Sequence, residues 1–152
     1  MVTDHEGDNY NADIIQLTIS GNTGTGGVTL EGLPGDPKSD ATGFFSVKVD
    51  YGWGGTVTPV KEGWEFEQGS KIYSSVLSDQ TDQRFTAKPI TYTISGYTIG
   101  LSGVTMDGLP GRPVTGADGS YSDEVPYNWS GTVTPKKAGY TFEPTNRTYN
   151  GV

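Results

Sequence analysis

The sequence repeats itself over almost its whole length, and this internal repeat limits the fold more than any other feature. Residues Thr3–Gly21 align on Ser78–Gly96 without a gap. After a one-residue insertion, Gly27–Val76 aligns on Gly103–Val152 in the same way. The chain therefore encodes two copies of one small structural unit. The alignment also predicts that the sequence opens partway through a unit.

Each unit is predicted to consist of short β-strands separated by turns. Apolar and polar residues alternate in Phe45–Val49, Trp64–Phe66 and Arg84–Lys88, which is the pattern of strands with one buried face. With 23 Gly and 9 Pro in 152 residues, every candidate helix is interrupted. We expect the following side chains to point inward, with Tyr73 on the opposite face: Ile15, Leu17, Ile19, Ile90, Tyr92, Ile94, Ile72 and Val76.

The composition excludes several classes of protein and partner. A hydrophobic content of 32% is too low for one large core and suits two thin ones. There is no cysteine, so disulfides and thiolate metal sites are excluded. The net charge of −8 argues against nucleic acid and anionic membranes as partners. No apolar run approaches the roughly 20 residues of a membrane-spanning helix, so we expect no membrane span.

The last strand of the repeat is the feature that points to a function. In the first unit we predict it at Arg84–Lys88, and the second unit reaches Val152 without an equivalent. The matching sequence is Asn9–Asp13, at the other end of the chain. A sandwich without its last strand exposes unpaired backbone groups and can accept a strand from elsewhere. Because the last strand runs directly into the next unit, we expect the units to lie end to end and a second subunit to supply the strand.

The spare strand predicts a donor segment, two sandwiches and a head-to-tail contact between identical subunits. The boundaries are 1–14 for the donor strand, 15–89 for the first sandwich and 90–152 for the second. Such a contact is heterologous and generates an open filament unless its rotation closes. The donor residues are predicted to be Tyr10, Ala12 and Ile14, and the acceptor groove is predicted to contain Phe142, Tyr149 and Val152.

Several motifs of the repeat resemble a known group of domains. The motifs are Ile-Ser-Gly, Gly-Val-Thr-Leu or Gly-Val-Thr-Met, Gly-Thr-Val-Thr-Pro, Ala117–Ser122 and Gly139–Pro144. Together they resemble the carboxypeptidase regulatory-like and bacterial immunoglobulin-like repeats of prokaryotic cell-surface proteins. The resemblance implies an all-β fold with two tandem Ig-like or prealbumin-like β-sandwiches, in an extracellular or cell-surface protein. The first unit departs from the pattern at Ala41–Gly43, where the turn lacks its aspartate.

The sequence gives little support for catalysis or a cofactor. It has one histidine, His5, and no nucleophile elbow, phosphate loop or zinc spacing. We therefore expect no enzyme activity, no catalytic residue, no metal site and no cofactor. Acidic residues gather in Asp4–Asp8 and Asp79–Asp82, and a structural calcium ion is the alternative interpretation of these oxygens.

The predicted function is structural: a subunit of an extracellular, pilus-like filament assembled by donor-strand complementation. The alternative is a carbohydrate-binding or spacer module excised from a longer tandem-repeat surface protein. Recurring aromatic residues are interpreted mainly as packing anchors, and a face that stacks on carbohydrate is the alternative. These residues are Tyr51, Trp53, Trp64, Tyr127, Trp129 and Tyr140.

Overall fold

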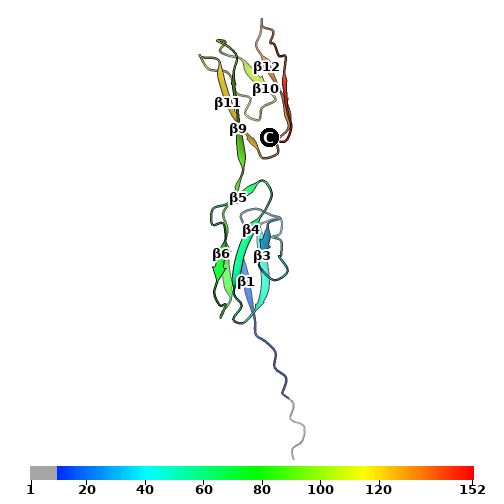
Figure 1. The fold of residues 1–152 in the computed structure, drawn as a ribbon, viewed down its shortest axis with the longest axis vertical. Helices are drawn as coiled ribbons and strands as arrows, with labels where there is room; N and C mark the ends of the chain where they lie inside the picture. Colours follow the sequence, from blue (N-terminus) through cyan, green and yellow to red (C-terminus); the bar gives the residue numbers. More distant parts are fainter. Residues whose placement is uncertain (1–9) are drawn as a thin grey trace, which may run out of the picture. The chain divides into compact units, whose positions relative to one another are not determined.

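The computed structural model describes residues 10–152, and every regular element in that range is a β-strand (Figure 1). These residues form two compact units. The first contains the chain up to Lys61 together with Phe66–Ala87, and the second contains Glu62–Glu65 with Lys88–Val152. Each unit has two sheets around its own core, so the predicted all-β sandwich class is confirmed.

The first unit has one three-stranded sheet on each side of its core. One sheet has the order β3-β1-β7 and the other β2-β4-β6. A separate short ladder pairs β5 with β8, and the residues of these two strands are divided between the two units. The bounds are β1 Gln16–Asn22, β2 Thr29–Glu31, β3 Phe44–Asp50, β4 Gly55–Val60, β5 Trp64–Phe66, β6 Lys71–Tyr73, β7 Gln80–Arg84 and β8 Ala87–Pro89. The pair β1 and β3 is antiparallel, whereas β7 runs parallel to β1.

The second unit repeats this arrangement with fewer strands. One sheet is the antiparallel pair β9 and β11, and the other has the order β10-β12-β13 (Figure 1). The bounds are β9 Thr91–Tyr97, β10 Thr105–Asp107, β11 Ser120–Pro126, β12 Gly131–Lys136 and β13 Arg147–Tyr149. By the repeat alignment β9 corresponds to β1 and β11 to β3. Within residues 10–152, no strand of the second unit corresponds to β7 or β8.

The two cores use equivalent positions of the repeat. Buried residues of the first core are Ile19, Val28, Leu30, Leu33, Phe45, Val49, Val57, Val76 and Phe85. Those of the second core are Ile94, Val104, Met106, Leu109, Val125 and Val133. The first core thus contains Phe85 from the end of β7, and among the described residues the second core has no counterpart of it.

The Gly-Leu-Pro-Gly motif forms the same turn in both units because its first glycine is held against a neighbouring strand. Gly32 and Gly108 have φ values of 91° and 103°. A Cβ atom on either would lie 2.0 Å from the carbonyl oxygen of Thr56 or Thr132, respectively. Only glycine accepts this combination of positive φ and close backbone approach.

Aspartates close the turn before β3 and the turn before β11, although they stand at different positions. In the second unit, Asp118 accepts hydrogen bonds from the backbone N and Oγ of Ser120, at 3.0 and 2.7 Å. In the first unit, where the sequence motif lacks that aspartate, Asp40 accepts from the backbone N and Oγ1 of Thr42, at 2.8 and 2.7 Å. The hydroxyl hydrogen bond is the main reason that the pKa of each carboxyl group is lowered.

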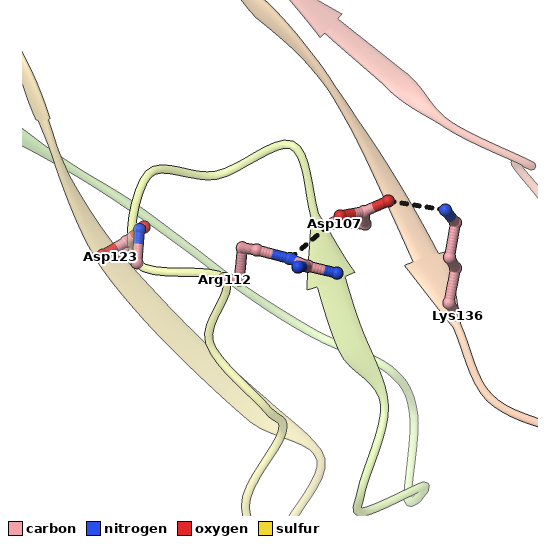
Figure 2. A network of polar contacts seen from close by, with 5 residues as sticks. Asp107, Arg112, Asp123 and Lys136 are labelled. Atoms are coloured by element: carbon pink, nitrogen blue, oxygen red, sulfur yellow. Dashed lines mark hydrogen bonds and ion pairs between the residues drawn. The ribbon is translucent and has the colours of Figure 1, made fainter.

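A charged network lies in the second unit, around the loop between β10 and β11 (Figure 2). Asp107 lies between two cations, with Oδ1 3.0 Å from Nε of Arg112 and Oδ2 2.5 Å from Nζ of Lys136 (Figure 2). The hydrogen bond and charge of Lys136 are the main causes that lower the pKa of Asp107. Asp123 Oδ2 accepts a hydrogen bond from the backbone N of Gly111 at 2.7 Å, so the first part of this loop is fixed to β10 and to β11. The equivalent positions of the first unit are Glu31, Asp36, Val47 and Val60.

Three predictions about strand faces are wrong. Ile15 is 63% exposed because β1 begins one residue later, and Tyr92 is 44% exposed. Ile72 is 77% exposed, whereas Tyr73 packs against the core. The prediction assumed that Ile72 and Val76 lie on the same face of one strand. Because β6 ends at Tyr73, the burial of Val76 does not determine which way Ile72 points.

The last strand of the first unit also lies earlier than predicted. Instead of one strand at Arg84–Lys88, the chain forms β7 up to Arg84, turns Phe85 into the core and then forms β8 from Ala87.

Candidate strand-acceptor site

The first unit shows how the last strand of the repeat is held. Strand β7 pairs with β1 through Ile19 opposite Gln80 and Gly21 opposite Gln83, with a shift of register between these pairs. Asp82 lies at the shift and has a φ of 55°. Such an irregularity is a β-bulge, in which one residue takes a left-handed conformation and the strand bends.

Phe85 follows the strand and is the side chain that closes the core. It is 2% exposed, and its ring centroid lies 6.3 Å from that of Phe45. The ammonium group of Lys71 lies 5.1 Å from the Phe85 centroid, in cation–π geometry. The backbone N–H of Phe85 donates to the carbonyl oxygen of Asn22 at 3.0 Å, so the main chain is fixed where the ring enters the core.

Two polar side chains fix the register of β7. Gln83 Oε1 accepts hydrogen bonds from the hydroxyl of Tyr73 at 2.9 Å and from Nζ of Lys71 at 3.4 Å. Asp79, just before β7, accepts a hydrogen bond from the backbone N of Thr18 at 2.7 Å. Burial raises the pKa of Tyr73, whose hydroxyl is protonated at neutral pH and donates the hydrogen bond to Gln83.

A glycine in β1 makes room for this strand. A Cβ atom at Gly21 would lie 1.8 Å from the carbonyl oxygen of Gln83, so no larger residue fits while β7 is in place. The repeat carries a glycine at the same position in the second unit, Gly96.

In the second unit, a cavity occupies the region where β7 and Phe85 lie in the first. Its volume is about 450 Å³, and it is lined by Tyr121, Phe142, Arg147 and Tyr149 among other residues. Strand β9 pairs with β11 on one side, and on its other side no strand within residues 10–152 pairs with it. A second hollow of about 410 Å³ includes Gly96 and borders the same strand.

The space next to Gly96 is filled by a side chain instead of a strand. A Cβ atom at Gly96 would lie 2.8 Å from the hydroxyl oxygen of Tyr121, which is the counterpart of Phe45. This ring is only partly buried, whereas Phe45 is 3% exposed. Burial and the neighbouring Tyr149 raise the pKa of Tyr121, and the charge of Arg147 acts in the opposite direction. Tyr121, Arg147 and Tyr149 all line the cavity.

The predicted donor residues are all exposed. Tyr10 is 93% exposed and Ile14 59% exposed, and Ala12 is exposed as well. Tyr10 aligns with Phe85, the residue that is buried in the first unit. The rest of the aligned segment, residues 3–9, lies outside the described residues.

The predicted acceptor residues fall into two groups. Phe142 and Tyr149 line the cavity and pack against the second core. Val152 also packs against that core, but it does not line the cavity. Its backbone instead pairs with Asn128 and Trp129, at 2.6 and 3.0 Å.

Sequence reasoning missed two residues of the site, Gly96 and Arg147. Both could have been found from the repeat, because they align with Gly21 and Lys71. The alignment alone does not show that these two positions touch the last strand, since they are far from it in sequence.

The alternative sites receive less support. Within residues 10–152, no group of three or more His, Asp or Glu side chains is placed to hold a metal ion. In the same range, no helix is long and apolar enough to cross a membrane. Trp53 and Trp129 pack against the cores, with ring centroids 5.8 and 6.1 Å from those of Tyr73 and Tyr149. The two tryptophans are therefore anchors of the packing.

Comparison with known proteins shows a likeness in fold. No family model matches the chain, and no curated protein matches it. Among solved structures, the Bacillus anthracis TIE protein is similar, with a TM-score of 0.57 and 16% sequence identity. The match covers 90% of this chain and 31% of that one. The likeness concerns the fold, and the chain spans less than a third of the length of the protein it matches.

Proposed function

We propose that the protein is a structural subunit whose copies join head to tail, with the N-terminal segment of one copy completing the second unit of the next. The segment would pair in parallel with β9 and place Tyr10 in the cavity beside Phe142 and Tyr149. The product is an extracellular filament, and the protein performs no chemistry of its own. The extracellular location follows from the resemblance to surface-protein repeats.

The observation that carries this proposal is the agreement between the N-terminal segment and the structural roles of β7. Asp4 aligns with Asp79, whose carboxylate accepts the backbone N–H of Thr18. Gly7 aligns with Asp82, the residue with positive φ at the bulge, and glycine is the residue best suited to that conformation. Thus the bulge position and the register-fixing carboxylate recur in the segment.

The acceptor also retains what the strand requires. Like Gly21, Gly96 has no Cβ atom that would obstruct the main chain of an incoming strand, and the end of the Tyr121 side chain, which would have to move, lies there instead. Thr93 aligns with Thr18, the residue whose N–H is accepted by Asp79. Burying the exposed ring of Tyr10 is worth about 1.5–3 kcal/mol, and main-chain pairing adds to this. Since donor and acceptor are different surfaces, the contact repeats without limit unless it closes into a ring.

The proposal is tested by separating the two halves of the contact. A Tyr10→Asp variant has a defective donor and an intact acceptor, and a Gly96→Ala variant has the reverse. Each should sediment as a monomer, and their mixture should form a dimer that grows no further. A Tyr51→Asp variant, which alters another exposed tyrosine, should assemble like the parent. Monomers in the mixture, or undiminished assembly of Tyr10→Asp, would contradict the proposal.

A second candidate is a spacer in a longer polypeptide, where the same pairing joins successive repeats. It is favoured by the first unit, whose last strand belongs to the same polypeptide and leads directly into the next repeat. The two candidates differ in whether the strand comes from another molecule. Because the isolated chain would carry a donor and an acceptor in either case, the mass of the native polypeptide separates the two candidates: a chain of 16.2 kDa supports the subunit, and a much longer polypeptide supports the spacer.

A further inference from the structure

We propose that an ion pair between Asp8 of one copy and Arg147 of the next selects the acceptor for the donor strand. This inference rests on the function proposed above and names the residues that make the contact specific. It concerns the donor position that aligns with Gln83, and in the first unit the contacts of Gln83 are made within one chain.

In the first unit this position is occupied by a neutral side chain. Gln83 Oε1 lies 2.9 Å from the hydroxyl of Tyr73 and 3.4 Å from Nζ of Lys71. The amide oxygen of Gln83 thus accepts hydrogen bonds from one neutral donor, Tyr73, and one charged donor, Lys71. Within the chain, the last strand is therefore held without a carboxylate at this point.

Both sides of the contact change in the second unit. The donor position becomes Asp8 in place of Gln83, and Lys71 is replaced by Arg147, while the tyrosine is retained as Tyr149. A carboxylate is thus predicted to face a guanidinium group. Arginine binds carboxylates through two parallel N–H donors, and lysine binds them as a point charge, so the change increases directionality as well as charge.

Arg147 is available for such a contact. It is exposed in β13 and lines the cavity beside Tyr121 and Tyr149. Within residues 10–152, no carboxylate lies within 4.0 Å of its guanidinium group, whereas Arg112 of the same unit is already paired with Asp107. Arg147 and Tyr121 line the same cavity, and the charge of Arg147 acts to lower the pKa of Tyr121.

The cavity lining also contains an acidic residue, but the first unit has an acidic residue at the same position of the repeat. Glu143 aligns with Glu67, so a carboxylate occurs at this position in both. In the first unit Glu67 contributes its backbone N–H, which donates to the carbonyl oxygen of Thr86 at 3.1 Å. The exchange of Gln83 and Lys71 for Asp8 and Arg147 is accordingly the difference that adds an opposite-charge pair.

The consequence is a contact between copies that depends on salt. A partly exposed pair contributes modestly to affinity, but it favours the matching partner and accelerates association at low ionic strength. At about 1 M salt the screening length is about 3 Å, and most of this contribution is lost. An Asp8→Asn variant should therefore show a weaker dependence of assembly on salt than the parent.

A charge exchange tests the pair directly. Association constants are measured by sedimentation velocity in about 50 mM salt, where screening is weak, for D8R, R147E and the double variant D8R/R147E, all as full chains. We expect each single variant to associate roughly tenfold or more weakly than the parent, and the double variant to recover most of the loss. Two controls carry the same charge changes outside the donor segment and the cavity: E31R at an exposed position of the first unit and R112E in the second unit. Both should associate within about threefold of the parent.

The outcomes separate this inference from the proposed function. If D8R and R147E associate like the parent, or if the double variant stays as weak as the singles, the ion pair is wrong. The Tyr10→Asp variant then shows whether strand donation still holds. If Tyr10→Asp also associates like the parent, strand donation and the ion pair fail together. Should R147E not fold, the salt dependence of Asp8→Asn decides, and a dependence equal to that of the parent overturns the pair.

Discussion

At the scale of single residues, Gly21 and Gly96 show the difference between a filled and an open site. Both are the same position of the repeat, but the main chain of Gln83 lies against Gly21, and only the end of the Tyr121 side chain lies against Gly96. A backbone atom held in a ladder cannot move away, whereas a partly buried ring at a cavity can. The same substitution should therefore have different effects at the two positions.

We predict that Gly21→Ala destabilises the first unit, whereas Gly96→Ala leaves the folded monomer nearly unchanged and prevents assembly. The Cβ introduced by Gly21→Ala would lie 1.8 Å from a carbonyl oxygen, which displaces β7. We expect a loss of about 2–4 kcal/mol for Gly21→Ala and under about 1 kcal/mol for Gly96→Ala. Urea denaturation measures the stability and sedimentation the assembly. Equal losses of stability at the two positions would show that the sites do not differ in occupancy.

The aromatic residues of the two last-strand sequences allow a second comparison. Phe85 is buried in its own chain, so Phe85→Ala should lower the free energy of unfolding by about 3–5 kcal/mol. Tyr10 is 93% exposed, so Tyr10→Ala should leave the stability of the monomer unchanged and weaken association. Tyr10→Phe retains the ring and should assemble. The prediction fails if Tyr10→Ala destabilises the monomer as much as Phe85→Ala does.

At the scale of elements, the sequence predicted the class of the strands better than their faces. The period-two pattern and the Gly-Leu-Pro-Gly turns indicated the all-β fold, because they depend on local backbone preferences. The exposure of Ile72 was not predictable in this way, since it follows from the end of β6 at Tyr73. Apolar spacing does not show where a strand ends.

The candidate site was predictable only in part, for the same reason. Phe142 and Tyr149 could be chosen because they are aromatic and repeat. Arg147 and Gly96 also occupy repeated positions, but that these positions contact the last strand is visible only in the first unit, where Lys71 and Gly21 lie against Gln83. Long-range pairing, here parallel and interrupted by a bulge, brings these positions together.

The aspartates in the turns before β3 and β11 make the folding stability depend on pH in the acidic range. The pKa values of Asp40 and Asp118 are lowered in the folded chain, chiefly by hydroxyl hydrogen bonds. Their contribution is complete above the ordinary aspartate pKa of about 3.9 and is lost as the pH falls through the lower folded value. The thermal midpoint should therefore decrease below about pH 4, and Asp118→Asn should reduce this decrease while still folding at neutral pH. Thermal denaturation followed by circular dichroism from neutral to strongly acidic pH measures the effect, and an identical profile for Asp118→Asn would contradict it.

At the scale of the whole molecule, the two copies of the repeat differ in their last strand within residues 10–152. The first has β7 and Phe85 in place, and the second has an unpaired edge on β9 and a cavity of about 450 Å³ within the described residues. If a missing strand is the reason for assembly, supplying that strand within the chain should abolish it. A self-completed chain is obtained by adding a copy of Leu77–Lys88 after Val152, since Val152 aligns with Val76.

The most decisive experiment is the sedimentation of the parent and the self-completed chain over a range of concentrations. Strand donation predicts that the parent forms assemblies that grow with concentration, and that the self-completed chain remains a monomer with a higher thermal midpoint. A chain with the same added residues in scrambled order should behave like the parent. If the parent and the self-completed chain sediment alike at every concentration, strand donation between copies is wrong.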